Sequence, residues 1–161
     1  MNKLIYLLIV CLAFFNCTGQ EPTSFSDAAL NDTFIDLQGE EVTFKDILQA
    51  HKGQTIVIDI WASWCKDCIG GMPKVKVLQQ AHQEVVYIFL SLDKSQEAWK
   101  KGIEKYDVNG THYFMQSGWK GDFGSFVNLD WIPRYMVIDK EGNIKVFKAV
   151  EADDKKIKDV L

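Results

Sequence analysis

The sequence predicts a single α/β domain with a central mixed β-sheet and helices on both of its faces. Two apolar runs, residues 55–61 and 85–92, are continuous rather than alternating, which is typical of strands covered on both sides. A helical segment separates them, and strand, helix, strand in this order forms a right-handed crossover. The chain has 161 residues, of which 47% are hydrophobic and 25% charged, enough for one core of ordinary size.

The first elements of this domain are short. Residues 33–37 and 41–44 flank a Gln-Gly-Glu turn and predict a small N-terminal β-hairpin extension. Thr43 and Asp46 then form a capping-box pattern for a helix that ends near Gly53. The first strand of the crossover follows directly.

The crossover helix is expected over residues 65–83. Gly70, Gly71 and Pro73 are expected to interrupt this helix, and Pro73 should kink it because proline has no N–H to donate. After the second crossover strand, Ser95 can cap a further helix over residues 96–106.

The last third of the chain predicts five short elements. They are an extended piece at residues 111–116, a helix at 122–127, strands at 135–139 and 144–150, and a closing helix capped by Asp153. The two strands are joined by a turn and should pair antiparallel. The order βαβ, helix, ββα indicates one layer of sheet between two layers of helices.

The charge of the chain gives no reason to expect a nucleic-acid partner. Its formal net charge is −4, whereas proteins that bind the phosphate backbone carry clustered positive charge. The closest approach to a basic cluster is formed by Lys155, Lys156 and Lys158, which we expect on the solvated face of the closing helix.

The N-terminus predicts export. Residues 1–16 combine a short positive start with an apolar run that suits a signal peptide and is too short to span a bilayer comfortably. Cys17 follows in a segment that resembles the lipobox of bacterial lipoproteins, although Asn16 stands where a small residue is usual. We expect lipidation of Cys17, a tether over residues 17–30 and the folded domain at 31–161; plain secretion and an uncleaved anchor are the alternatives.

Cys65 and Cys68 carry the chemistry. They lie at a strand-to-helix junction, where the unpaired N–H groups and the macrodipole of the helix favour a thiolate at Cys65. The other two cysteines lie in or at the end of the export signal, so a static disulfide framework is excluded. A structural zinc site needs four ligands, and His51, His82 and His112 lack ligand spacing. We therefore expect neither a metal nor another cofactor.

Four segments together resemble the thioredoxin fold, and more narrowly the exported TlpA-like and ResA-like thiol-disulfide oxidoreductases. They are Ile58-Asp59-Ile60-Trp61-Ala62-Ser63-Trp64-Cys65-Lys66-Asp67-Cys68, Pro73, Ile132-Pro133 and Ile138-Asp139. The resemblance covers about residues 34–161. The helix expected at residues 96–106 stands where the TlpA-like branch carries its helical insertion.

The resemblance implies roles for five residues. Cys65 would attack a substrate disulfide, and Cys68 would resolve the mixed disulfide that results. Pro133 would be cis and lie against the cysteines, whereas a trans proline that merely begins a strand is the alternative. The backbone of Ile132 would offer strand-like hydrogen bonds to a substrate segment, and Trp64 at the rim is either a binding or a packing residue.

Asp59 stands where thioredoxins carry a buried carboxylate thought to take the proton of the second cysteine. A buried carboxyl with a raised pKa suits that transfer near neutral pH, whereas a solvated or purely structural aspartate is the alternative. The chain departs from its relatives nearby. Gly71 replaces a glutamate common in TlpA-like proteins, and Phe89 stands where thioredoxin has a lysine that faces its buried acid.

The predicted function is thiol-disulfide exchange with exported protein thiols and disulfides, with a reducing role preferred because Asp59 helps a reduced pair react. An upstream membrane or periplasmic redox donor is implied, and the membrane is contacted only through a lipid anchor or the signal segment. A peroxiredoxin-like thiol peroxidase is disfavoured because Ala62 replaces the Thr or Ser of that family. A non-enzymatic binding module would not need both cysteines. Arg134 adjoins the expected groove, where we expect a solvated side chain rather than a contact to an acidic partner.

Overall fold

The computed structural model describes residues 20–161; the expected signal at residues 1–16 and Cys17 lie outside the described residues. The helices are α1 (Asp27–Asn31), α2 (Phe44–Ala50), α3 (Lys66–Ala81), α4 (Gln96–Tyr106), α5 (Asp122–Phe126) and α6 (Lys155–Lys158), with a 3-10 turn η1 (Gly118–Lys120). The strands are β1 (Thr33–Ile35), β2 (Glu41–Thr43), β3 (Ile56–Trp61), β4 (Val86–Ser91), β5 (Thr111–Phe114), β6 (Arg134–Ile138) and β7 (Ile144–Ala149).

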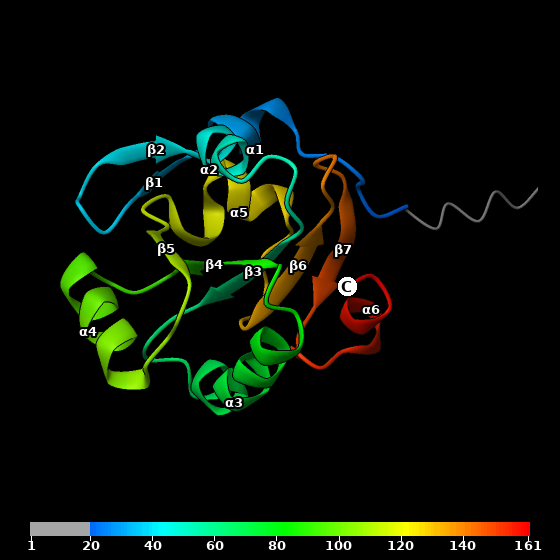
Figure 1. Ribbon diagram of the computed structural model, residues 1–161. Helices are drawn as coiled ribbons and strands as arrows, with labels where there is room; N and C mark the ends of the chain where they lie inside the picture. The colour runs from blue at the N-terminus through cyan, green and yellow to red at the C-terminus, as the bar shows by residue number, and fades with distance from the viewer. Residues whose placement is uncertain (1–19) are drawn as a thin grey trace, which may run out of the picture.

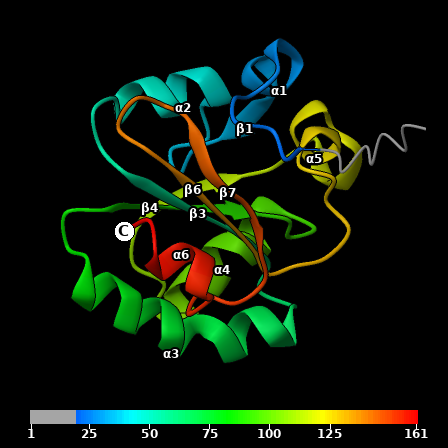
Figure 2. The same ribbon diagram turned by 90° about the vertical axis from the view of Figure 1, so that its right-hand side faces the viewer.

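All seven strands form one sheet in the order β2-β1-β5-β4-β3-β6-β7. β3, β4 and β5 pair in parallel, and the remaining neighbours pair antiparallel. Figure 1 shows α1, α2 and α5 above this sheet and α3 and α4 below it, and the turned view in Figure 2 shows the same two layers, with α6 on the side of α3. This confirms the predicted mixed sheet with helices on both faces.

The predicted helix caps follow from local hydrogen bonding. Thr43 Oγ1 accepts from the Asp46 N–H at 3.1 Å, and the Asp46 carboxylate accepts from the Thr43 N–H at 3.3 Å, which completes the capping box of α2. Ser95 Oγ accepts from the Ala98 N–H at 3.2 Å and begins α4 at its predicted residue.

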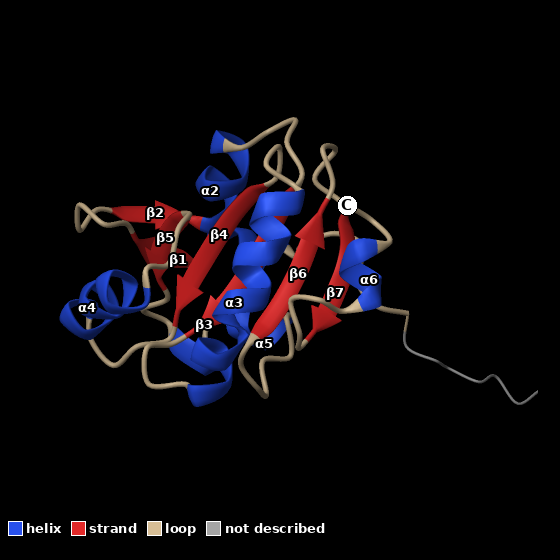
Figure 3. Ribbon diagram, turned by 60° about the horizontal axis from the view of Figure 1, so that its bottom comes forward, coloured by secondary structure: helices blue, strands red, loops and turns tan. Residues whose placement is uncertain are grey.

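The expected interruption of the crossover helix is wrong, because α3 continues through Gly70, Gly71 and Pro73. The ring of Pro73 removes one backbone hydrogen bond, but burial of one face outweighs this loss of local stability. That face contacts the sheet through residues at helical spacing, namely Cys68, Met72, Val75 and Leu78. Figure 3 shows α3 lying across β3 and β6.

The closing helix begins one residue later than predicted. Asp154 is its N-cap and accepts from the Lys156 N–H at 2.9 Å. Asp153 instead pairs with Lys74 of α3 at 3.1 Å, so its carboxylate links the end of the chain to the crossover helix. The three lysines of α6 are exposed, as the sequence predicts.

The packed body begins earlier than the expected boundary at residue 31. The Thr23 carbonyl accepts from the Ile144 N–H at the start of β7, at 2.8 Å. Phe25 contacts the Phe44 ring with centroids 4.8 Å apart, and Ala29 of α1 is fully buried. The C-terminal part of the expected tether over residues 17–30 therefore packs against the domain, because Phe25 contacts an aromatic cluster there.

Arg134 is buried, which corrects the expectation of a solvated side chain. Its guanidinium donates to the Val127 carbonyl at 2.7 Å and pairs with the exposed Asp130. Arg134 is the first residue of β6 and faces the α5 side of the sheet, where its charge is matched by carbonyl oxygens and by Asp130. It therefore fixes the segment between α5 and β6.

Replacing Arg134 by alanine is expected to lower the free energy of unfolding by about 2–4 kcal/mol, because the Val127 carbonyl loses its donor and a large buried side chain is removed. Urea denaturation of the oxidised protein measures this. Lys148→Ala is the matched control, since Lys148 contacts the same Asp130 at 3.0 Å from the surface and should cost less than about 1 kcal/mol. Equal losses in the two variants would contradict the structural role of Arg134.

Candidate active site

The two central cysteines form a disulfide at the start of α3, with their Cα atoms 5.3 Å apart. Cys65 is the N-cap residue of α3, and its sulfur accepts from the Cys68 N–H at 3.1 Å. When the pair is reduced, the same N–H and the positive end of the helix face the Cys65 sulfur. Both favour the thiolate at this position.

The two sulfurs differ in access. Cys65 is 6% exposed and Cys68 is 1% exposed, so even the attacking sulfur is more buried than the sequence suggests. Cys65 nevertheless lines a surface pocket of about 350 Å³, and Cys68 does not. Of the two sulfurs, Cys65 is therefore the one beside open surface, and Cys68 lies behind it.

Three tryptophans surround Cys65 in this pocket, which we call the tryptophan pocket: Trp64, Trp119 and Trp131. Trp64 and Trp131 are 50% and 56% exposed, which leaves indole surface open beside the sulfur. Trp119 was missed by the sequence analysis, because η1 is far from the cysteines along the chain and carries no local motif. Trp131 was not predicted as a site residue either. Its position directly before the Ile132-Pro133 pair is the sequence feature that could have indicated its role.

The Ile132–Pro133 peptide bond is cis, as predicted. β3 pairs with β6, and Ile60 lies opposite Arg134. Because Pro133 directly precedes Arg134 and β3 leads to Cys65, this pairing places the cis peptide bond close to the cysteines. The Cys65 sulfur lies 3.7 Å from the Ile132 carbonyl oxygen. The sulfur expected to attack and the backbone expected to bind substrate are therefore adjacent.

Asp59 lies in the middle of the sheet, 3% exposed, with Tyr135 and Phe89 as its neighbours on β6 and β4. This excludes the alternative of a solvated aspartate at a strand edge. Neither carboxyl oxygen hydrogen-bonds to any group within residues 20–161. Burial raises the pKa of Asp59 to about 8, and the nearby Tyr135 hydroxyl acts in the opposite direction.

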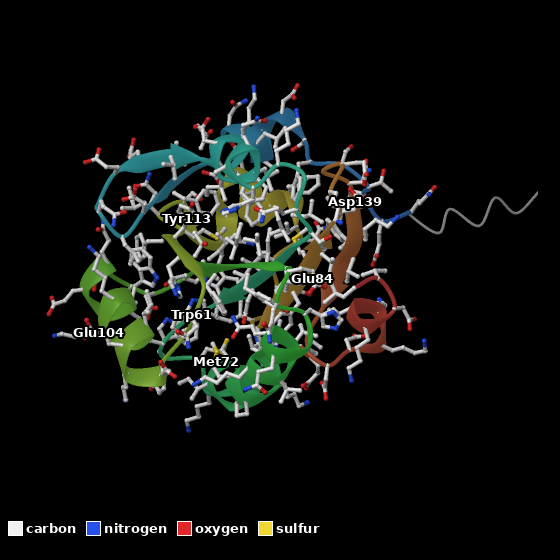
Figure 4. All side chains as sticks on the ribbon, viewed as in Figure 1. Trp61, Met72, Glu84, Glu104, Tyr113 and Asp139 are labelled. Carbon is white, nitrogen blue, oxygen red and sulfur yellow. A yellow bond between two sulfur atoms is a disulfide. The ribbon has the colours of Figure 1, made fainter. Side chains whose placement is uncertain are left out.

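The surroundings of Asp59 on the β4 side are uncharged. Phe89 stacks on His112 with ring centroids 5.2 Å apart. Burial lowers the pKa of His112, so the imidazole favours its neutral form. Trp61 and Met72 are also buried, between the sheet and the helices below it (Figure 4). No cation from this side stabilises the carboxylate of Asp59 among the residues that the structure describes.

A buried acid holds the loop that leads to Cys65. The Asp93 carboxylate accepts from the Ser63 N–H at 3.1 Å and from the Ser63 hydroxyl at 2.6 Å. It also accepts from the Ser91 hydroxyl at 2.8 Å. No sequence pattern predicts this contact, because Ser63 and Asp93 are 30 residues apart. The result is a fixed backbone directly before Trp64.

Two further findings concern the described part of the chain. Residues 20–161 contain no cluster of three or more His, Cys, Asp and Glu side chains arranged to hold a metal ion. None of the helices within this range combines the length and the apolar character needed to cross a membrane.

Comparisons with known proteins agree with this geometry. The sequence pattern of the thioredoxin-like family matches residues 53–144. The thiol-disulfide oxidoreductase ResA of Bacillus cereus is 26% identical over 89% of this chain and 86% of its own. The thiol:disulfide interchange protein DsbE of Pasteurella multocida is 27% identical over 96% of this chain and 91% of its own.

A solved structure gives the same result for the fold. The thiol:disulfide interchange protein of a Bacteroides species superimposes with a TM-score of 0.63 and 26% identity, covering 84% of this chain and 85% of that one. The match to the family spans more than half of the chain and includes Asp59, both cysteines and the cis proline. The chain therefore belongs to the thioredoxin-like family.

Proposed function

We propose that this protein is an exported thiol-disulfide oxidoreductase that acts on protein disulfides, with reduction as its net direction. The observation that carries the proposal is the Cys65–Cys68 pair itself: one sulfur lines a surface pocket and its partner is buried behind it. The relatives that match most of the chain bear names for this reaction.

The reaction begins with the reduced pair. The Cys65 thiolate attacks one sulfur of a substrate disulfide, the substrate S–S bond breaks, and a mixed disulfide forms. The released substrate sulfur takes a proton from water. Cys68 then loses its proton and attacks the Cys65 sulfur, which forms the Cys65–Cys68 disulfide and releases the second substrate thiolate. Two electrons pass to the substrate, and an external dithiol must return them.

Asp59 is proposed as the acceptor of the Cys68 proton. Cys68 is buried among apolar groups, which raises the pKa of a thiol and makes it a weak nucleophile until it is deprotonated. Asp59 lies in β3, which α3 crosses, and its pKa of about 8 lets it take up and release a proton near neutral pH.

Substrate binding is assigned to Trp64, Ile132 and Pro133, with Trp119 and Trp131 added by the tryptophan pocket. An extended segment on either side of the substrate cysteine can hydrogen-bond to the backbone at Ile132. The indoles supply apolar surface that can contact substrates of different sequence. Recognition therefore relies on the substrate main chain more than on the charge of its side chains.

The proposed location and direction rest on two arguments. The signal-like residues 1–16 and a lipidated Cys17 would place the domain outside the cytoplasm on a membrane surface, where it would meet exported substrates and a membrane or periplasmic electron donor. A buried acid that takes up the proton of the resolving thiol speeds the attack of the protein's own dithiol on a substrate disulfide, which is the reaction of a reductase.

The two cysteines are expected to have different phenotypes in a turbidity assay of insulin reduction with dithiothreitol. Cys65→Ser abolishes catalysis because no accessible nucleophile remains. Cys68→Ser traps mixed disulfides that non-reducing mass spectrometry detects. Turnover retained by Cys65→Ser would reject the assigned nucleophile.

Replacing Asp59 by asparagine is expected to change how stability depends on pH. Between pH 3.8 and about 8 the folded protein keeps a proton on Asp59 that the unfolded chain has released. The free energy of unfolding therefore falls as the pH rises through this range, by up to about 1.4 kcal/mol per pH unit. Urea unfolding of the oxidised proteins from about pH 5 to about pH 8 should show a shallower decline in Asp59→Asn.

The comparison isolates one group, since every other titratable residue is common to both proteins. The same variant should also resolve mixed disulfides more slowly near neutral pH, because Cys68 loses its proton acceptor. Asp59 would have no role in the mechanism if Asp59→Asn and the unmodified protein showed the same pH dependence of stability and resolved mixed disulfides at the same rate.

The net direction is tested by equilibrating the Cys65–Cys68 pair with glutathione buffers and quantifying the alkylated thiols. A reductase should have a potential near the roughly −270 mV of reducing dithiols rather than the roughly −120 mV of oxidising ones. An oxidising value would reverse the proposed direction while leaving the exchange reaction intact.

A further inference from the structure

A second pocket opens on the other side of the cis proline. It encloses about 360 Å³ between α3, Pro133 and the segment after β7, and Gly71 and Tyr135 contribute to its wall. We call it the Gly71 pocket. It shares Lys66, Asp67 and Trp131 with the tryptophan pocket, so both open beside the same turn of α3. The exchange of substrate disulfides as described uses only the tryptophan pocket.

Tyr135 places a polar group in the wall of the Gly71 pocket. The residue is 1% exposed, and its hydroxyl lies 3.5 Å from the position that a Cβ on Gly71 would occupy. The hydroxyl has no hydrogen-bond partner among residues 20–161. Buried polar groups are nearly always paired with protein or water, and a water molecule takes up about 30 Å³. Tyr135 lines the Gly71 pocket, which has room for several waters beside this side chain.

The sheet register puts Tyr135 beside Asp59. The two residues are directly opposite in the antiparallel pair of β3 and β6, so their side chains project from the same face of the sheet. The Tyr135 hydroxyl lies 3.5 Å from the position that a Cβ on Gly71 would occupy, so this is the face covered by α3. On its other side, Asp59 has Phe89, which cannot carry a proton.

The phenol of Tyr135 stays neutral. Burial and the neighbouring Asp59 carboxyl raise the pKa of Tyr135 far above its ordinary value. A neutral phenol both donates and accepts a hydrogen bond. It can therefore take a proton on its oxygen while releasing its own.

We propose that Tyr135 and the Gly71 pocket form the path by which Asp59 exchanges its proton with solvent. This rests on the proposed function, in which Asp59 receives the proton of Cys68. The Asp59 acid passes its proton to the Tyr135 oxygen, and the phenol passes its own proton to water in the Gly71 pocket. The phenol is unchanged at the end, and no electrons move in this step. Tyr135 is a positioning residue that acts through Asp59.

The charged groups around the Gly71 pocket are exposed or paired with one another. Lys66 and Asp67 are exposed at the start of α3. Glu151 and Asp153 face the phenol from the segment after β7, and both pair with Lys74, at 2.6 and 3.1 Å. These pairs raise the pKa of Lys74 and lower that of Asp153, which moves both away from neutrality.

The experiment separates the two chemical steps in one trace. The reduced protein is mixed with dithiobis(nitrobenzoate), an aromatic disulfide whose thiolate absorbs visible light. Attack by Cys65 releases the first thiolate, and attack by Cys68 on the mixed disulfide releases the second. Both rates are followed by stopped flow from about pH 6 to about pH 10.

Tyr135→Phe and Gly71→Leu should slow the second release about tenfold near neutral pH and leave the first release unchanged. The first variant removes only the hydroxyl, and the second fills the Gly71 pocket. The difference from the unmodified protein should close at high pH, where Cys68 ionises without help. The controls are Tyr87→Phe, which removes a buried hydroxyl that donates to the Leu78 carbonyl at 3.1 Å, and Val77→Leu at an exposed position of α3.

The proposal would be overturned if Tyr135→Phe and the unmodified protein had the same pH profile for the second release. A slowing by the same factor at every pH would also overturn it, because that is the signature of a merely structural residue. Failure of the proposed function looks different: Cys65→Ser would keep the first release, or Asp59→Asn would leave the second release unchanged. A melting curve shows whether Gly71→Leu is folded. If Gly71→Leu does not fold, the result for Tyr135→Phe alone decides the outcome.

Discussion

The register between β3 and β6 is the constraint on which the site depends. Opposite residues share a face, so the pairing of Ile60 with Arg134 and of Asp59 with Tyr135 fixes two things at once. It delivers the cis Pro133 to the disulfide, and it places a phenol beside the buried carboxyl. A slip of one residue would exchange the two faces of β6 and bring the guanidinium to α3 in place of the phenol. Such a slip would disrupt both the proposed substrate-binding backbone beside the disulfide and the proposed proton path at Asp59.

Two adjacent residues of β6 divide this work between the faces of the sheet. Arg134 points toward α5 and holds the Val127 carbonyl and Asp130, which fixes the segment that enters the cis bond. Tyr135 points toward α3 and lines the Gly71 pocket with Gly71. Because strand side chains alternate, a dipeptide can anchor the loop on one side and form part of the site on the other. The burial of Arg134 is thus part of how the site is built.

The sequence predicts those features that depend on neighbours along the chain. The capping box of Thr43 and Asp46, the Ser95 cap and the cysteine pair are local patterns, and the family resemblance adds the cis proline. Contacts made by the fold are not predicted. Asp93 reaches Ser63 only after the sheet has formed, and the uninterrupted course of α3 reflects burial that outweighs its glycines and proline. Burial of a charged side chain such as that of Arg134 has no sequence signature when its partners are carbonyl oxygens.

The absence of a cation beside Asp59, among the residues that the structure describes, determines what this carboxyl can do. A lysine at the position of Phe89 would stabilise the carboxylate and lower its pKa, so that the group would rarely hold a proton at neutral pH. The stack of Phe89 on His112 keeps that side apolar, and the pKa of Asp59 rises to about 8. A neutral acid in the core costs less than a bare carboxylate would, yet it still titrates within reach of physiological pH. Of the two residues directly opposite Asp59 in the neighbouring strands, Phe89 has no polar group and Tyr135 has a hydroxyl, so the proposed route for the Asp59 proton runs on the Tyr135 side.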